Sequence, residues 1–449
     1  MAAGQGKRMH SARPKALHAL AGRPLVAHVL ATVRELAPRA LCLVIGHGAD
    51  AVRAELAAPD LTIVLQDPPR GTGDAVRVAL SALPADGVTL VANGDCPLIP
   101  AATFARLAAR AGAGRLALLT TRVVDPTGLG RVVRDDTGGV RAIVEQKDAS
   151  SAERAIDEIY TGALAAPTQL LQRWIGALRD DNVQREFYLT DIVAQAAAEG
   201  VGVEACTAEN AEDILGVNDR AQLATLERIV QTRIALRLMQ AGTSIADPAR
   251  IDVRGTLRCG RDVHIDVGCV FEGAVALGDD VTVGPYCVVR NTTLGAGTHV
   301  AAYSHLDGAT VDAGARIGPY ARLRPGAELA ADVHIGNFVE VKASRVGRGS
   351  KANHLAYIGD ATVGANVNVG AGTITANYDG VNKHRTVIGD RASIGSNCVL
   401  VAPVTVGDDA TIGAGSTLTA DAPPDALTLA RARQVTLPGW KRPTRKAKP

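Results

Sequence analysis

A chain of 449 residues is too long for one ordinary hydrophobic core, so its length predicts two or three domains. Hydrophobic residues make up 47% of it and charged residues 21%, as is typical of a folded globular protein. The formal net charge of +2 argues against a broad basic surface for nucleic acid or membrane lipid. No apolar run reaches the ~18 residues that a membrane-spanning helix needs.

Cysteine usage indicates the cellular compartment. The seven cysteines are scattered, and none is spaced as Cys-x-x-Cys. This pattern argues against disulfides and against a zinc site. Since the first residues also do not read as a secretory signal, we expect a cytoplasmic protein.

The first half of the sequence alternates short apolar stretches with helical stretches. Such alternation predicts an α/β domain over residues 1–218, with a parallel sheet covered by helices. The expected strands include 41–45, 61–65, 88–92 and 116–120.

A single long helix is predicted over residues 219–241. Leu223, Leu226, Ile229 and Val230 recur in it at intervals of three and four, and Gly242 ends it. This helix is the expected linker between two domains.

After Ile251 the apolar residues recur every six positions. Six residues suffice for a short strand and a turn, and glycine beside the apolar residue supplies turn conformations. A β-sandwich would instead repeat every ~8 to 12 residues. The pattern therefore predicts a β-solenoid from Ile251 to about Leu418, in a second domain over residues 242–449 that ends in a basic tail. Two runs hold the spacing without slippage: Ile317, Leu323, Leu329, Ile335 and Val341, and then Ile388, Ile394, Leu400, Val406, Ile412 and Leu418.

This six-residue repeat resembles the hexapeptide repeat of left-handed parallel β-helix acyltransferases. The resemblance implies three six-residue sides per coil, a left-handed winding and a homotrimer. The spacing by itself does not indicate the handedness.

A glycine-containing loop with basic side chains lies at residues 2–9, and Pro14-Lys15 follows it. Backbone amides beside glycine can approach phosphates, and Arg8 and Lys15 can neutralise them. A Gly-x-Gly pattern alone is equally compatible with an ordinary turn.

Asp95 follows the predicted strand 88–92, at the edge where open α/β sheets bind ligands. Its carboxylate is therefore a candidate ligand for Mg²⁺, which prefers oxygen donors. The alternative is a turn aspartate before Pro97.

The loop and the residues after the strands together resemble sugar nucleotidyltransferases, which join a sugar 1-phosphate to a nucleoside triphosphate. The resemblance implies in-line attack of the sugar phosphate on the α-phosphorus of UTP, with release of pyrophosphate. It implies Asp95 and Asn218 as the Mg²⁺ ligands. The substrate-binding positions that it implies are Ala2, Ala3, Gly4, Arg8, Lys15, Gln66, Gly71, Thr72, Asn93, Gly94, Asp95, Gly130, Glu145, Tyr160 and Asn218.

Two positions depart from that family. The family has an apolar strand before the loop, whereas here the loop begins at Met1. Either the true start lies upstream, which we favour, or the sheet lacks a central strand. We hypothesise that uridyltransferase activity is reduced or lost in the chain as given. The second departure is Tyr160, which stands where the family usually has Asn.

The six-residue spacing breaks between Ile374 and Ile388, where the polar residues 377–385 are expected to leave the solenoid as a loop. Acetyl transfer to an amine needs a base, and a neutral imidazole with a pKa near ~6.5 is suitable. His354 matches the catalytic position of the hexapeptide acyltransferases, although a lone histidine is more often structural.

The two domains in this order resemble the bifunctional GlmU-type enzymes of bacterial cell-envelope synthesis. The resemblance implies acetyl transfer from acetyl-CoA to glucosamine 1-phosphate, catalysed by His354. Uridylyl transfer from UTP to N-acetylglucosamine 1-phosphate would follow. The sugar-phosphate positions that it implies are Arg324, Lys342, Tyr357 and Asn368, and the acetyl-CoA positions are Ala371, Asn377, Tyr378, Ser396, Ala414 and Arg431.

Two alternatives stay open at this point. The chain could be a sugar nucleotidyltransferase whose solenoid is only a trimerisation scaffold, which would need neither His354 nor the 377–385 loop. It could also be an acetyltransferase whose first domain only binds nucleotide, which would not need the metal pair Asp95 and Asn218.

Overall fold

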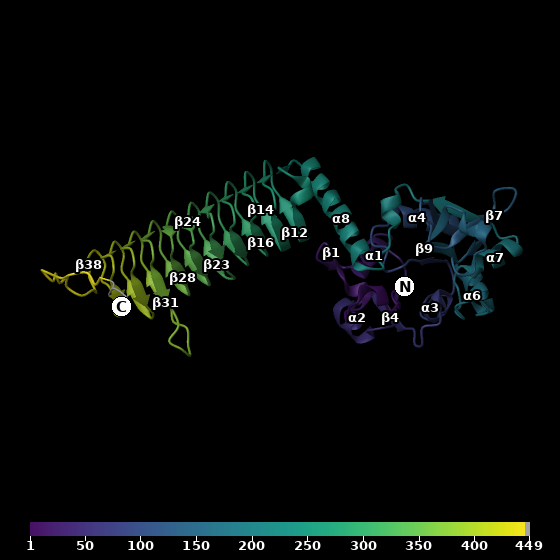
Figure 1. Cartoon of the computed structure of the whole chain (residues 1–449), viewed down its shortest axis with the longest axis horizontal. Coiled ribbons are helices and arrows are strands. Elements are labelled where there is room, and N and C mark those ends of the chain that lie inside the picture. The colour runs from purple at the N-terminus through teal and green to yellow at the C-terminus, as the bar shows by residue number, and fades with distance from the viewer. Residues whose placement is uncertain (445–449) are drawn as a thin grey trace, which may run out of the picture. The chain divides into compact units, whose positions relative to one another are not determined.

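The structure is a computed structural model that describes residues 1–444, and it divides into two compact units (Figure 1). The first unit is Met1–Val230, and the second begins at Gln231. Both contribute to the long helix α8 (Arg220–Gln240), which lies where the linker helix was expected. The domain bounds 1–218, 219–241 and 242–449 stay predictions.

The first unit contains two separate sheets packed with helices. Strands β3 (Leu41–Ile45) and β4 (Leu61–Leu65) form a parallel pair. The other sheet runs β10-β6-β9-β7-β8, and β5 pairs with β9. Its strands are β5 (Val88–Val91), β6 (Leu116–Arg122), β7 (Arg131–Arg134), β8 (Val140–Val144), β9 (Glu158–Pro167) and β10 (Val203–Thr207). The helices are α1 (Leu25–Arg34), α2 (Ala49–Leu56), α3 (Thr72–Leu80), α4 (Ala101–Gly112), α5 (Ser151–Arg154), α6 (Thr168–Ala177) and α7 (Asp191–Ala198), with a short hairpin of β1 (Ala19–Leu20) and β2 (Arg23–Pro24).

The expectation of an all-parallel sheet is wrong for this unit. Strand β9 runs antiparallel to both β5 and β6. A parallel return to β6 would need a crossover of a dozen or more residues, usually a helix. The chain instead returns through the antiparallel pair β7–β8 and the short helix α5, so β9 enters the sheet in the opposite direction.

The second unit is a stack of parallel coils. One sheet has eleven strands and the other has seventeen, and every pairing between their strands is parallel. Arg316 pairs with His299 on one side and with His334 on the other, so equivalent positions of successive coils stay aligned. This stacking confirms the predicted parallel β-solenoid after an α/β domain.

The eleven-stranded sheet consists of β11 (Ser244–Ile245), β13 (His264–Ile265), β15 (Thr282–Val283), β18 (His299–Val300), β21 (Arg316–Ile317), β24 (His334–Asn337), β27 (Lys351–His354), β30 (Asn368–Val369), β33 (Ser393–Ile394), β36 (Thr411–Ile412) and β38 (Leu427–Thr428). The seventeen-stranded sheet supplies the other two faces of each coil. It consists of β12 (Asp252–Cys259), β14 (Val270–Leu277), β16 (Val288–Arg290), β17 (Thr293–Leu294), β19 (His305–Asp307), β20 (Thr310–Val311), β22 (Arg322–Leu323), β23 (Ala327–Leu329), β25 (Glu340–Lys342), β26 (Ser344–Val346), β28 (Tyr357–Gly359), β29 (Ala361–Val363), β31 (Ile374–Ala376), β32 (Thr386–Ile388), β34 (Val399–Val401), β35 (Val404–Val406) and β37 (Thr417–Leu418).

The six-residue ladder forms the interior of the coils. Ile317, Ile335 and Ile394 are at most 1% exposed, and burial of one such side chain contributes roughly 1.5–3 kcal/mol. Buried hydroxyl groups satisfy backbone groups of neighbouring coils. Ser350 Oγ, for example, donates to the Gly364 carbonyl at 2.7 Å and accepts from the Val367 amide at 2.8 Å.

Candidate active sites

The glycine loop opens onto a cavity of about 590 Å³ at the ends of β3, β4 and β5. Most of the predicted triphosphate and base contacts line it: Ala2, Ala3, Gly4, Lys15, Gln66, Gly71, Thr72, Asn93, Gly94 and Asp95. Sequence reasoning missed Gln5, Pro69 and Glu186, which also line it. Arg8 is exposed and does not line the cavity.

The two predicted Mg²⁺ ligands, Asp95 and Asn218, both contact the ammonium group of Lys15. The Lys15 ammonium lies 2.5 Å from Asp95 Oδ2 and 3.0 Å from Asn218 Oδ1. The Val217 amide donates to the Asp95 carbonyl at 3.0 Å, which fixes the segment before α8 beside the end of β5. One carboxylate and one amide oxygen suit Mg²⁺, which keeps several waters and takes further ligands from substrate phosphates.

Gln66 and the start of α3 form a preorganised wall. The Gln66 side chain is buried, and its Nε2 donates to the Gly71 carbonyl and to Asp74 Oδ2, both at 3.0 Å. Gly71 has φ +105°, and a Cβ there would lie 2.6 Å from the Phe187 carbonyl oxygen. Thr72 Oγ1 accepts a hydrogen bond from the Leu189 amide at 3.0 Å. Position 71 therefore requires glycine. Hydrogen bonds from the Gln66 side chain to Gly71 and from the Leu189 amide to Thr72 hold the wall in place.

The predicted sugar contacts form a second group next to this cavity. The Tyr160 amide donates to the Gly130 carbonyl at 2.9 Å, and Glu145 accepts from Thr190 Oγ1 at 3.1 Å. Burial raises the pKa of Glu145. The Tyr160 hydroxyl is buried without a hydrogen-bond partner among residues 1–444, and burial raises its pKa.

Gly162 joins the two groups, because its backbone passes against Asn93. Its φ is +88°, and a Cβ there would lie 2.0 Å from Asn93 Nδ2. Asp191, which sequence reasoning missed, lies near Glu145; burial and then Glu145 raise the pKa of Asp191 to about 6. Since its carboxyl group matches no motif, no pattern in the sequence distinguishes it.

In the solenoid, Asn337 orients His354. The two residues are register partners on β24 and β27, and His354 Nδ1 lies 2.7 Å from Asn337 Oδ1. Because an amide oxygen only accepts, this contact places the imidazole proton on Nδ1 and leaves the Nε2 lone pair free. Asn337 was not predicted, although it lies one coil before His354 in the repeat.

Coil register places several predicted acetyl-CoA contacts in one column with His354. Ala352 pairs with Val369, Val369 with Ile394, and Ile394 with Ile412. The residues two positions after each of these are aligned, and adjacent coils are ~4.8 Å apart. The column therefore reads His354, Ala371, Ser396 and Ala414, and Arg431 Nη1 donates to the Ala414 carbonyl at 2.6 Å.

The predicted phosphate-binding cations lie on the neighbouring face. Arg324 Nη1 is 2.8 Å from Glu340 Oε1, and Lys342 Nζ is 3.3 Å from Asp360 Oδ2. The 377–385 loop adds Lys383, whose pKa the Lys342 side chain lowers. Three basic side chains thus gather beside two carboxylates, which offset only part of their charge.

The remaining predicted residues lie on strands or in the loop beside these groups. Tyr357 pairs with Glu340, and Asn368 pairs with Lys351. Asn377 Nδ2 donates to Asp360 Oδ2, and the Tyr378 hydroxyl donates to the Gly380 carbonyl at 2.5 Å within the loop.

Comparison with known families gives the class of protein. Residues 1–155 match the family described as MobA-like NTP transferase domain, and residues 385–420 match the Bacterial transferase hexapeptide (six repeats). The chain is therefore a two-domain transferase. None of the helices described is long and apolar enough to cross a membrane.

Full-length relatives then define the particular family. The chain is 58% identical to the Bifunctional protein GlmU of Cupriavidus pinatubonensis, over 100% of this chain and 99% of the relative. It is 55% identical to the Bifunctional protein GlmU of Herminiimonas arsenicoxydans, over 99% and 98% of the two chains. It is 57% identical to that of Bordetella bronchiseptica, over 100% and 99%. The chain belongs to the Bifunctional protein GlmU family, and these matches give no support to the hypothesis of lost activity.

Proposed function

We propose that this chain makes UDP-N-acetylglucosamine in two steps at two separate sites. The solenoid transfers the acetyl group of acetyl-CoA to the amine of glucosamine 1-phosphate. The first unit then transfers the uridylyl group of UTP to N-acetylglucosamine 1-phosphate and releases pyrophosphate. One observation carries the proposal: Asn337 holds His354 in a column of small residues, and the basic side chains Arg324 and Lys342 lie on the neighbouring face.

In the acetyl-transfer step His354 is the base. With Nδ1 held by Asn337, Nε2 takes a proton from the sugar amine as that amine attacks the thioester carbonyl. The carbon–sulfur bond then breaks, and coenzyme A leaves as the thiol after protonation. Arg324 and Lys342 hold the sugar phosphate, because cationic side chains suit a phosphate dianion.

The acetyl-CoA arm lies along the column formed by Ala371, Ser396 and Ala414. Small side chains at these positions leave room for a pantetheine chain beside the coil. Asn377 and Tyr378 of the loop and Arg431 after the last coil complete the cofactor contacts.

In the uridylyl-transfer step the glycine loop binds the triphosphate. Its amides and the Lys15 ammonium offset phosphate charge, and Arg8 approaches from the exposed end of the loop. Asp95 and Asn218 would hold Mg²⁺, which supplies further charge neutralisation when bound. Gln66, Gly71 and Thr72 hold the uracil, while Gly130, Glu145 and Tyr160 hold the sugar.

An exposed row of aromatic side chains supports a homotrimer. Tyr286, Tyr303, Tyr320 and Phe338 stack with ring centroids 5.1 to 5.4 Å apart, and each is about half exposed. Phe338 directly follows Asn337 in the chain, so a subunit that covers the row also lies near His354. We place the enzyme in the cytoplasm, in synthesis of peptidoglycan and lipopolysaccharide precursors.

One incubation tests the proposal. The protein is supplied with glucosamine 1-phosphate, acetyl-CoA, UTP and Mg²⁺, and the products are identified by mass spectrometry. UDP-N-acetylglucosamine, coenzyme A and pyrophosphate are expected. Absence of N-acetylated product would favour the scaffold alternative, and absence of pyrophosphate would favour a first unit that only binds nucleotide.

Two variants assign the steps to the two sites. His354→Ala is expected to lose acetyl transfer and keep uridylyl transfer from N-acetylglucosamine 1-phosphate. His299→Ala, which removes an exposed histidine of the solenoid, is the matched control and is expected to keep both. Asp95→Asn is expected to show the converse loss, with Mg²⁺-dependent pyrophosphate release as the readout.

A further inference from the structure

Asp360 has no role in the proposed reactions, yet it holds residues assigned to both substrates of acetyl transfer. Its carboxylate oxygen Oδ2 lies 3.3 Å from the Lys342 ammonium, and the same oxygen accepts a hydrogen bond from Asn377 Nδ2. Lys342 is a proposed contact of the sugar phosphate, and Asn377 is a proposed contact of acetyl-CoA. One oxygen atom therefore joins the two substrate sites.

Asp360 also holds both ends of the 377–385 loop. The loop leaves the coil after β31 at Asn377, which the carboxylate binds. It returns at Thr386, whose amide donates to the Asp360 carbonyl at 3.4 Å. The Asp360 amide in turn donates to the Lys342 carbonyl at 3.0 Å. The base of the loop is thus attached through Asp360 to the strand that carries Lys342.

The backbone at this corner of the coil does not require an aspartate. Asp360 has φ +49° and follows Gly359, which is the register partner of Lys342. Ala343, the residue after Lys342, occupies the same corner of the preceding coil with φ +45°. Since alanine adopts this left-handed conformation one coil earlier, the turn itself does not account for a carboxylate here. The side-chain contacts of Asp360 do account for it.

The carboxylate lies among basic side chains. Lys342 and Lys383 contact each other; this contact and then Asp360 raise the pKa of Lys342, whereas Lys342 lowers the pKa of Lys383. Arg324 adds to the positive charge near Lys383. The Asp360 side chain is only 20% exposed, so its charge is screened less than that of a surface aspartate. A phosphate bound at Lys342 would therefore compete directly with Asp360 for the ammonium group.

This competition makes the two binding events interdependent. In the structure the Asp360 oxygen is shared between Lys342 and Asn377. When a phosphate takes up the Lys342 ammonium, that oxygen is left to Asn377, whose side chain is then held more firmly. A side chain ordered in advance lowers the cost of binding the next ligand. Coupling of this kind is reciprocal, so each substrate would strengthen binding of the other.

We propose that Asp360 is a positioning residue that couples the two substrates of acetyl transfer, so that bound sugar phosphate strengthens binding of the coenzyme. The inference rests on the proposed function, because it takes Lys342 and Asn377 as contacts of the two substrates. Asp360 acts through these two side chains and touches neither substrate.

Titration calorimetry with coenzyme A measures the coupling without turnover. Coenzyme A and glucosamine 1-phosphate cannot react with each other, and the first unit has no proposed site for coenzyme A. Saturating glucosamine 1-phosphate is expected to tighten coenzyme A binding about fivefold in the full-length parent. In Asp360→Asn and Asp360→Ala, the dissociation constants with and without the sugar phosphate are expected to agree within about twofold. Asp360→Ala gives this corner the residue type that the preceding coil has there.

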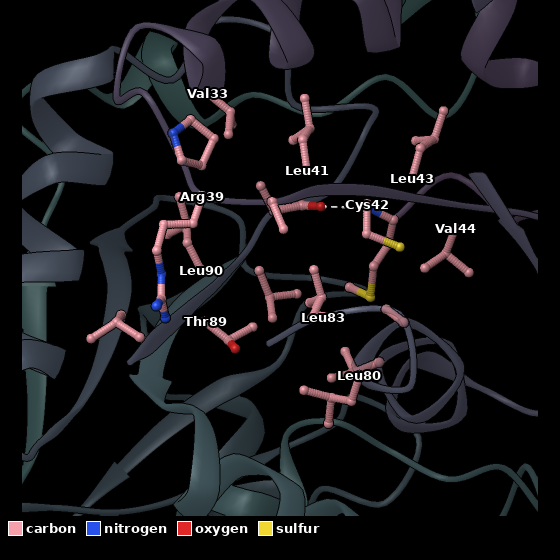
Figure 2. A pocket seen from close by; sticks show the side chains of 18 of the residues that line it. Val33, Arg39, Leu41, Cys42, Leu43, Val44, Leu80, Leu83, Thr89 and Leu90 are labelled. Atoms are coloured by element: carbon pink, nitrogen blue, oxygen red, sulfur yellow. Dashed lines mark hydrogen bonds between the residues drawn. The ribbon is translucent and has the colours of Figure 1, made fainter. Parts of the chain in front are cut away.

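The matched control is Asp279→Asn, because Asp279 is also paired with a basic side chain, that of Arg261, but lies near the start of the solenoid. This variant is expected to keep the coupling of the parent. Alkylation of two half-buried thiols reports folding independently of any proposed activity. Cys259 reports on the solenoid, and Cys42, which lines an apolar cavity of the first unit (Figure 2), reports on that unit.

The outcomes separate this inference from the function on which it rests. A parent that makes no N-acetylated product would contradict the proposed function, and the inference would fall with it. With an active parent, coupling of equal size in Asp360→Asn would overturn the inference alone, as would a parent that binds both ligands without coupling. If neither Asp360 variant folds, Asn377→Ala replaces them, because it removes the other partner of Asp360 Oδ2 and should abolish the coupling as well. Coupling retained in Asn377→Ala would then overturn the inference.

Discussion

The hydrogen bond between Asn337 and His354 predicts a graded loss of acetyl transfer. His354→Ala removes the proposed base, and general-base catalysis contributes typically 10² to 10⁴ in rate, or about 3 to 5 kcal/mol. Asn337→Ala leaves the imidazole but removes its acceptor 2.7 Å from Nδ1. One such hydrogen bond contributes about 0.5 to 1.5 kcal/mol, so the rate should fall roughly 2- to 13-fold.

The two variants together decide whether Asn337 acts through His354. Acetyl transfer is followed by release of the coenzyme A thiol, and uridylyl transfer by the same preparations serves as the folding control. If Asn337 only orients the imidazole, Asn337→Ala should have no further effect in the His354→Ala background. An additional loss of the same size in that background would refute the reasoning, as would acetyl transfer within threefold of the parent in His354→Ala.

Three further predictions concern the first unit. The raised pKa of Asp191 (about 6) means that the folded state holds this proton more tightly than the unfolded state, so ionisation opposes folding. As the pH rises from about 4 to 6, stability measured by urea unfolding is therefore expected to fall by ~1 kcal/mol more in the parent than in Asp191→Asn, after screening, because Glu145 also has a raised pKa and contributes in both. Tyr160→Phe removes a buried hydroxyl that lacks a partner among the described residues, so it should not lower the unfolding temperature; a clear drop would contradict this. Gly162→Ala should destabilise by more than ~2 kcal/mol because of the Asn93 clash and the positive φ, whereas Gly176→Ala in open space should not.

The solenoid was predictable from sequence because one period controls both its backbone and its core. The six-residue spacing of residues such as Ile388 and Ile394 directly gives the buried positions of successive turns. The break after Ile374 is equally local, and the structure places a loop there, with Tyr378 and Lys383 facing each other across it. In a periodic fold, a break in the spacing therefore indicates where the chain leaves the regular coils.

The first unit was predictable only in part, because its sheet depends on contacts that are distant in sequence. The strands β3 and β4 have the bounds expected from their apolar runs. The prediction of a parallel sheet was wrong at β9, which is antiparallel to β5 and β6, since an apolar run carries no information on whether its partner is parallel. The approach of Lys15 to Asp95 and Asn218 depends on the packing of three separate segments, and no spacing in the sequence indicates it.

Register explains how one exposed histidine becomes part of an extended site. Each coil is positioned by its buried column, so Asn368 pairs with Ser393 even though the 377–385 loop lies between them in sequence. The alignment that continues from β30 through β33 to β36 therefore does not depend on the loop. His354, Ser396 and Ala414 keep their spacing for this reason, while the loop is free to bring Lys383 to Lys342. In the proposed acetyl transfer, the coils would fix where the thioester lies relative to His354, and the loop would supply Lys383 as a positive charge for the phosphate.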